Sequence, residues 1–201
     1  MKNDQLKGKK IAVLAANFFE QVELTKPLAA LKEAGAEVKV VSPDSGQIQG
    51  MNHADKGDKI KVDLTLDEAN AQDFDAIMIP GGTMNPDSLR SSKPALEFVK
   101  HFFRTGKPAA LICHAPWVLI DAELADGRTL TSWPAIQTDL KNAGAHWIDE
   151  DVVVDNGLVT SRKPDDIPAF VNKMIEEFGE GKHTPAEKLV SGREAPVTIE
   201  T

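Results

Sequence analysis

The hydrophobic residues of this chain fall into short continuous runs that alternate with segments of helical spacing. Apolar runs at 11–16, 76–79 and 109–112 predict strands that are buried on both faces of a sheet. The valines of 38–41 predict a further strand. Residues 152–160 predict an antiparallel hairpin, because two apolar runs flank an Asn-Gly pair, which is a common two-residue turn.

Apolar residues at three- and four-residue spacing predict helices between these strands. This spacing occurs over 24–34, 94–103, 133–140 and 168–178, and a glycine follows each segment as the expected stop. A shorter, buried helix is expected after Pro116, since proline suits a first helical turn.

The remaining segments carry weaker patterns. Residues 43–60 are rich in Gly, Asp, Ser and Asn, which predicts loops with room for a short hairpin. Alternating residues at 60–64 predict an exposed or edge strand. A short helical or turn segment is expected from 67 and a short strand at 147–148, whereas 80–87 is expected to be a loop.

Strands that alternate with helices predict an α/β fold, in which a doubly wound, mostly parallel sheet carries helices on both faces. In such folds, sites form outside the carboxyl ends of the strands. Three loops of unusual chemistry follow predicted strands, at 17–23, 80–87 and 113–116. We therefore expect these loops to converge on one crevice.

The composition is that of one acidic globular domain. The chain has 201 residues, and we expect a single domain over 10–179, a polar lead-in over 1–9 and a polar extension over 180–201. A net charge of −8 argues against binding to nucleic acid or to an anionic membrane. A lone cysteine forms no internal disulfide, and no apolar run is long enough to span a membrane. We expect a cytoplasmic protein.

Cys113 is the candidate nucleophile because it stands at a predicted strand-to-helix turn. Backbone N–H groups and a helix start at such a turn are expected to lower the pKa of a thiol. His114 follows at once and can pair with the thiolate. A small buried side chain is the structural alternative, but the turn and the adjacent imidazole favour a reactive thiol.

Residues of the other two loops can serve this thiol. Glu20 and Glu23 share one face if their segment is helical, so either carboxyl group can hold the proton of the thiol. Solvated acids at a helix start are an equally good interpretation. Gly81 and Gly82 let the backbone approach a substrate, and the N–H groups of Gly82 and His114 can stabilise an oxyanion. A plain tight turn is the alternative for the two glycines.

Asp87 leaves an open choice, because it can cap the next helix or orient an imidazole as the third member of a triad. No metal is expected, since one cysteine offers no zinc spacing and the histidines are dispersed, at His53, His101, His146 and His183. No cofactor is expected either, because the sequence has no phosphate-binding loop.

Six segments, in order through almost the whole core, carry a resemblance to a known family. They are F-F-E-Q-V-E-L-T-K-P (18–27), F-D-A-I-M-I-P-G-G (74–82), P-D-S-L-R (86–90), G-K-P-A-A-L-I-C-H-A-P (106–116), N-A-G-A-H-W (142–147) and V-V-V-D-N-G-L-V-T-S-R-K-P-D-D (152–166). With them the chain resembles the PfpI-type intracellular cysteine peptidase and protein deglycase superfamily.

The resemblance implies a class I glutamine amidotransferase-like fold of the flavodoxin-like type. It implies a nucleophile at Cys113, a histidine partner at His114, and oxyanion donors from the backbone of Gly82 and His114. It also implies a glutamate in contact with the thiol, and the spacing favours Glu23, with Glu20 close by. In the PfpI-like branch an acidic residue of a neighbouring subunit completes the triad.

Asp87 occupies the position of that acidic residue, so the resemblance implies a homo-oligomer, either a dimer or a hexamer. The sequence departs from the branch in two places. Ala115 stands where glycine is usual, and Trp133 stands where a tyrosine often lies near the site. The chain has no tyrosine at all, so the pocket formed with Gly81 and Trp133 is expected to be more apolar.

The expected function is a stress-protective cysteine hydrolase that acts on peptide bonds or on glyoxal-type adducts through a Cys113 thiolate. The residues do not decide between these substrates. The alternative is a redox sensor or chaperone-like protein whose Cys113 is oxidised with little turnover. A glutamine amidotransferase subunit ranks lower, because we find no distant H-x-E pair placed to serve the cysteine.

Overall fold

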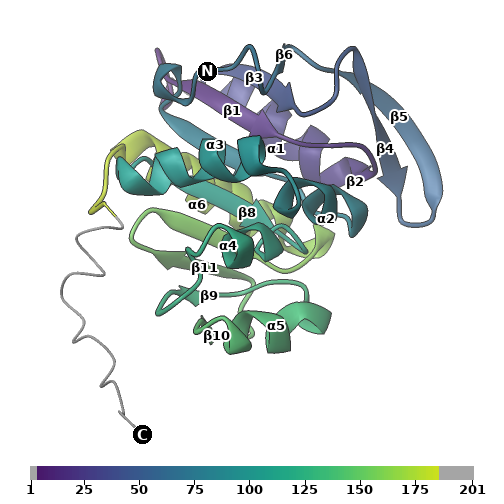
Figure 1. Ribbon diagram of the computed structural model, residues 1–201. Helices are drawn as coiled ribbons and strands as arrows, with labels where there is room; N and C mark the ends of the chain where they lie inside the picture. The colour runs from purple at the N-terminus through teal and green to yellow at the C-terminus, as the bar shows by residue number, and fades with distance from the viewer. Residues whose placement is uncertain (1–3, 186–201) are drawn as a thin grey trace, which may run out of the picture.

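A computed structural model describes residues 4–185 of the chain, and a seven-stranded sheet lies at the centre of this part (Figure 1). The strand order is β11-β12-β8-β7-β1-β3-β6, and only the edge pair β11–β12 is antiparallel. The predicted α/β class is therefore confirmed. The strands are β1 (Lys10–Leu14), β3 (Glu37–Ser42), β6 (Leu64–Thr65), β7 (Ala76–Ile79), β8 (Ala109–Ile112), β11 (Val152–Asp155) and β12 (Leu158–Ser161).

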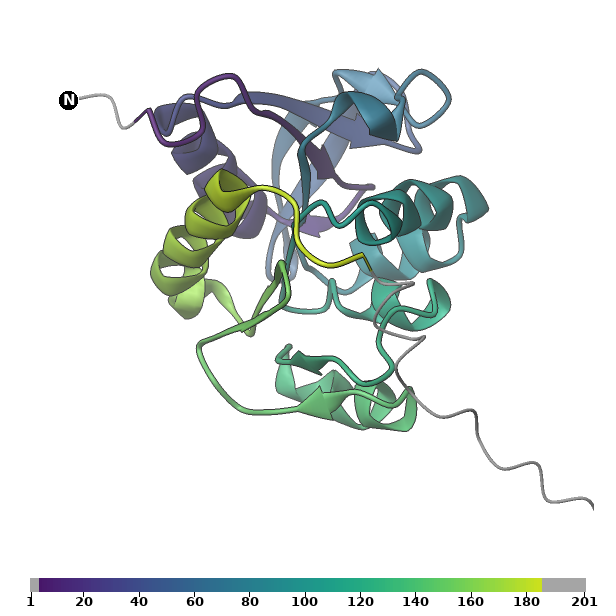
Figure 2. The same cartoon turned by 90° about the vertical axis from the view of Figure 1, so that its left-hand side faces the viewer.

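Helices cover both faces of the sheet, because alternate residues of each buried strand point to opposite sides. In β1, Ile11 and Val13 join the core beneath one helix layer, whereas Ala12 and Leu14 join the core beneath the other. Figure 2 shows the two layers on either side of the sheet. The first holds α1 (Gln21–Glu33) and α6 (Ile167–Glu180), and the second holds α2 (Met84–Arg90), α3 (Lys93–Arg104) and α4 (Trp117–Asp121).

The direction of winding reverses beside β1. β3 pairs with one edge of β1, and β7 pairs with the other edge. The order β3-β1-β7-β8-β12 is the flavodoxin-like arrangement, in which ligands bind at the point of reversal outside the carboxyl ends of the strands. The loops after β1 and β7 leave from this point, and Cys113 follows β8, the next strand along.

A hairpin of β4 (Gln47–Asn52) and β5 (Asp55–Lys61) occupies the segment that was expected to consist largely of loops. β4 also pairs in parallel with β2 (Phe19–Glu20), so the hairpin stands beside the loop that follows β1 (Figure 1). A further two-stranded sheet pairs β9 (Thr129–Leu130) with β10 (His146–Trp147). α5 (Gln137–Asn142) lies between these two strands in the chain.

Several boundaries differ from the predicted ones. The segment expected as a loop at 80–87 turns into α2 from Met84 onward. Trp133 does not belong to a helix, because a 3-10 turn, Pro134–Ile136, begins after it and leads into α5. α6 continues through Gly179 and ends at Glu180, and the C-cap residue Gly181 has a φ of 90°, which glycine adopts readily.

Both ends of the described chain pack onto this core. Leu6, within the expected lead-in, is fully buried, and its N–H donates to the Ala34 carbonyl at 2.8 Å. The expected extension over 180–201 is described only as far as residue 185, and its first residue, Glu180, belongs to α6. Between residues 4 and 185, no helix is long and apolar enough to cross a membrane.

Candidate active site

Cys113 lies immediately after β8 in a left-handed backbone conformation, with φ at 64°. This region is uncommon for a residue with a side chain, and it is typical of strained functional turns. Two hydrogen bonds hold the turn, since the Cys113 N–H donates to Ser161 at 3.0 Å and its carbonyl accepts from Trp133 at 2.9 Å. The turn raises the side chain from the edge of the sheet, although the residue is only 7% exposed.

His114 pairs with this thiol. Its Nδ1 lies 3.2 Å from the Cys113 Sγ. The imidazole stacks on Trp133, with ring centroids 5.8 Å apart, and its other neighbour is Trp117, at 5.4 Å. Burial lowers the pKa of His114, so the imidazole is mainly neutral at pH 7 and can accept a proton.

Glu23 is the glutamate that contacts the thiol. It lies in the first turn of α1 and is completely buried, and its Oε2 and the Cys113 Cβ lie on the same side of Gly81, each 2.5 Å from where a Cβ atom on that glycine would be. Its Oε2 accepts the Gly81 N–H at 3.0 Å. Burial raises the pKa of Glu23 to about 8, and the charge of Glu20 acts in the same direction, so the carboxyl group holds a proton at neutral pH.

The pKa of the Cys113 thiol is raised, which contradicts the expectation that the turn would lower it. Burial is the main cause, and the negative charge of Glu23 adds to it. The backbone N–H groups of Gly82 and His114 act in the opposite direction, but α4 begins only at Trp117 and has five residues. Two adjacent buried negative charges are unfavourable, so the Cys113 thiol can ionise only while Glu23 keeps its proton, and His114 is the base placed to accept the proton of the thiol.

Close contacts around positions 81 and 82 leave no room for a side chain, so both positions require glycine. A Cβ atom on Gly81 would lie 2.5 Å from both the Cys113 Cβ and the Glu23 Oε2. Gly82 has a φ of 80°, and a Cβ there would lie 2.7 Å from the Glu20 nitrogen. The two glycines therefore allow the loop after β7 to approach the thiol, and the Gly82 N–H is directed to the sulfur.

Asn85 secures this loop, and sequence reasoning missed it. Its side chain is completely buried, where its Oδ1 accepts the Ala16 N–H at 2.7 Å. Its Nδ2 donates to the Pro80 carbonyl at 2.6 Å and to the Gly81 carbonyl at 3.3 Å. Asn85 thus joins the ends of the two strands at which the winding reverses. An asparagine in an expected loop gave no signal of such a role.

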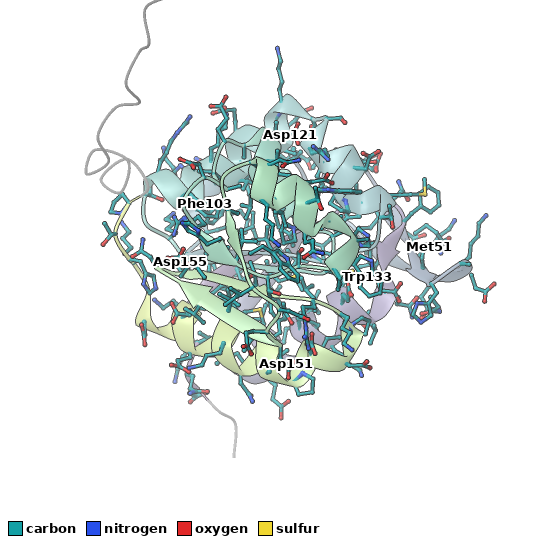
Figure 3. The ribbon with its side chains drawn as sticks, turned by 90° about the horizontal axis from the view of Figure 1, so that it is seen from below. Met51, Phe103, Asp121, Trp133, Asp151 and Asp155 are labelled. Carbon is teal, nitrogen blue, oxygen red and sulfur yellow. The ribbon has the colours of Figure 1, made fainter. Side chains whose placement is uncertain are left out.

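A cavity of about 380 Å³ opens in front of the thiol. Four of the expected site residues border it besides Cys113 and His114, namely Glu20, Glu23, Gly82 and Trp133. Trp133 and Met51 are labelled in Figure 3. The lining also contains residues that were not expected: Phe18, Met51, His53, Thr83, Met84 and Pro164. Met51 and His53 come from the β4–β5 hairpin, whose Gly/Asp/Ser/Asn-rich sequence concealed them.

Glu20 and Asp87 do not contact the thiol in the described part of the chain. Glu20 lies on the cavity wall, and its Oε2 accepts the His53 N–H at 3.1 Å. Asp87 is exposed in the first turn of α2. It does not cap α3, because the Ser92 side chain occupies that position and accepts the Ala95 N–H. The capping interpretation of Asp87 is therefore wrong.

The fold and this site together define an α/β protein of the doubly wound class that carries a cysteine on a strand-to-helix elbow. A sequence model of the DJ-1/PfpI family matches residues 9–177, and the chain belongs to that family. The family expected from the sequence motifs is thereby confirmed.

Relatives of this chain carry names from stress response, deglycation and proteolysis. The chain is 45% identical over 170 residues to "General stress protein 18" of Bacillus subtilis, covering 84% of this chain and 96% of that protein. It is 44% identical over 167 residues to "Deglycase PfpI" of Pyrococcus furiosus, covering 83% and 98% of the two chains. It is also 44% identical over 168 residues to "Putative cysteine protease YraA" of Bacillus subtilis, covering 84% and 97%.

The solved structure of Drosophila melanogaster DJ-1beta superposes with a TM-score of 0.78 at 29% identity, covering 85% of this chain and 90% of that one. The family thus supports a stress-related hydrolase or deglycase.

Proposed function

We propose that this protein is a cysteine hydrolase of stress protection that removes glyoxal-type adducts through the Cys113 thiolate. One observation carries the proposal: the sulfur has an imidazole nitrogen at 3.2 Å, a buried carboxyl group and the Gly82 N–H beside it in one cavity. This set contains a nucleophile, a base, an acid and an oxyanion donor.

The chemistry balances with water as the only co-substrate. The thiolate attacks the carbon of a methylglyoxal hemiaminal that bears the amine, the C–S bond forms, the C–N bond breaks, and the amine leaves with a proton. His114 then moves the proton of that carbon to the neighbouring carbonyl carbon, and the hydroxyl proton passes to the neighbouring carbonyl oxygen, which converts the hemithioacetal into a thioester of lactate. Water cleaves the thioester, releases lactate and returns a proton to the Cys113 sulfur.

The size of the cavity favours a small adduct. About 380 Å³ is at the small end of ordinary ligand sites and suits a three-carbon adduct with part of its amine carrier. The name of the Pyrococcus furiosus relative, at 44% identity, points to the same substrate class. Peptide bonds are the second substrate class, which the name of the relative YraA favours.

The proposed active site is completed by a second copy of the chain. Among the described residues, no carboxylate contacts His114, whose neighbours are Cys113, Trp117 and Trp133. Asp87 is exposed on α2, and α2 begins at Met84 on the rim of the cavity. We propose that Asp87 of a neighbouring subunit orients His114 in a homo-oligomer, either a dimer or a hexamer.

A redox role is the second candidate function. The N–H groups of Gly82 and His114, together with a protonated Glu23, would donate hydrogen bonds to the oxygens of a Cys113 sulfinate. Such a protein would be modified rapidly by peroxide at Cys113 and would protect cells without turnover.

Three substrates separate these functions: methylglyoxal-treated N-acetyl-lysine, free methylglyoxal and a fluorogenic peptide. Wild type, Cys113→Ser, His114→Ala and the control His146→Ala, on an exposed strand residue, are compared. We expect lactate release from the treated amine by wild type and control, and at least a hundredfold loss in both site variants. Turnover of free methylglyoxal alone would show that the enzyme converts the free aldehyde to lactate and does not release it from amines. No turnover of any of the three substrates would favour the redox function.

A further inference from the structure

Two glutamates and a histidine gather at the end of α6, away from the thiol. Glu177 and Glu180 are three residues apart on the last turn of the helix, so they share a face. His183 follows the helix, and one ligand atom from each of the three residues lies within 4.8 Å of the others. From the sequence the histidines were expected to be dispersed, and the approach of His183 to these two carboxylates was not anticipated.

The position of His183 is fixed by its surroundings. Its N–H donates to the Gly106 carbonyl at 2.7 Å. Its ring packs on Gly157, where a Cβ atom would lie 2.6 Å from the ring Cδ2. The next residue, Thr184, exchanges two hydrogen bonds with the Asn156 side chain, at 2.8 and 3.2 Å. Figure 2 shows this segment, in yellow, crossing from α6 toward α3.

The cluster is remote from the active site along the strands. Gly106 and Gly157 precede β8 and β12, whereas Cys113 follows the carboxyl end of β8. The two sites therefore lie at opposite ends of the sheet.

The buried polar atoms of Glu177 and His183 make few hydrogen bonds. The Glu177 side chain is only 10% exposed, and its one close polar neighbour among the described residues is the His183 Nε2, at 3.3 Å. That Nε2 is buried, and apart from this 3.3 Å contact it has no polar partner among the described residues. The negative end of the α6 macrodipole and the charge of Glu180 both disfavour a negative charge on the Glu177 carboxylate. Burial raises the pKa of Glu177. A cation would relieve each of these costs.

We propose that Glu177, Glu180 and His183 form a binding site for a divalent transition metal of the zinc type. One imidazole nitrogen and two carboxylates are a common three-ligand set for zinc, with water as a fourth ligand. The Glu180 side chain is exposed, so it can rotate inward to complete the site. The ion would join α6 to the segment that follows it and hold that segment against the ends of β8 and β12.

The test uses the full, untagged chain with Cys113→Ser, because the thiol would otherwise bind zinc. Calorimetric titration with Zn²⁺ and the visible absorption of Co²⁺ are recorded for this protein. They are repeated after adding His183→Ala or Glu180→Gln. There are two control variants. Glu176→Gln changes the residue next to Glu177, whose carboxylate already pairs with Lys173. His146→Ala changes an exposed histidine elsewhere.

We expect one ion per chain, a tetrahedral Co²⁺ spectrum, and an increase in the thermal midpoint with added Zn²⁺. His183→Ala should abolish the spectrum, Glu180→Gln should weaken the affinity at least tenfold, and both controls should bind like the parent. Glu180 is exposed, so its substitution tests the site even if His183→Ala fails to fold. Absence of binding, or binding that neither site variant weakens, would overturn the proposal and leave a His183–Glu177 ion pair.

Discussion

Gly81 lies against Cys113 so closely that no side chain fits between them: a Cβ atom on Gly81 would be 2.5 Å from the Cys113 Cβ. The same glycine donates its N–H to Glu23. The loop after β7, the elbow after β8 and the first turn of α1 therefore meet at one glycine.

Gly81→Ala should displace this junction. The added methyl group also meets the Ile112 carbonyl at 2.8 Å, so neither neighbour can yield easily. We expect a loss of about 1–3 kcal/mol in the free energy of unfolding, measured with urea, together with loss of turnover. Gly179→Ala is the matched control, because its nearest neighbours lie at 3.8 Å or more inside a helix. It should gain about 0.5–1 kcal/mol, and equal losses in the two variants would contradict the steric account.

Glu23→Gln should alter the dependence of stability on pH. The pKa of Glu23 is raised in the folded protein from 4.5 to about 8, so folding favours the protonated carboxyl group. Its stabilising contribution is complete below pH 4.5 and is lost as the pH rises to about 8, by about 5 kcal/mol at most. Urea unfolding between pH 4.5 and 8 should show this decline in wild type and a shallower one in the variant. Parallel curves would mean that Glu23 ionises normally.

The same substitution should impair catalysis. A glutamine keeps an oxygen for the Gly81 N–H but has no acidic proton to supply to the reacting groups, so turnover should fall by about 10²–10⁴-fold at pH 7. Glu20→Gln is the comparison, because Glu20 borders the cavity without contacting the sulfur. A larger loss for Glu20→Gln would reverse the roles that we assign to the two glutamates.

Trp133→Ala should raise the pKa of His114. Burial lowers that pKa in the wild type, and Trp133 covers one face of the imidazole. Removal of the indole admits water, which restores the charged form. The pKa of the His114 ring, measured by NMR titration, should move toward 6.5. An unchanged His114 titration would show that Trp117 alone shields the ring.

Asn85→Ala should slow turnover more than it weakens substrate binding. It leaves the Ala16 N–H and the Pro80 carbonyl without a partner in a buried region and frees the loop that carries Gly82. Each unsatisfied buried group costs about 1–3 kcal/mol, so the urea midpoint should fall and kcat should drop with little change in KM. Asn70→Ala, which removes an exposed cap on a short 3-10 turn, is the control. A change in KM alone would assign Asn85 to substrate binding.

The fold could be predicted because strands buried on both faces of a parallel sheet read as short continuous apolar runs, as at 76–79 and 109–112. The placement of Cys113 and His114 followed from the strand ahead of them. The local sequence could not reveal the raised thiol pKa, since it depends first on the burial of the thiol by the surrounding fold and then on the charge of Glu23, ninety residues away. Asn85 and the hairpin residues were missed for a similar reason, because their roles come from contacts distant in the chain.

The β4–β5 hairpin borders the cavity but lies outside the central sheet, joined to it through the short pairing of β2 with β4. Met51 and His53 can therefore change without any alteration of the elbow, the glycines or the buried carboxyl group. Selection on that hairpin alone could give proteins with one reaction centre different substrate preferences.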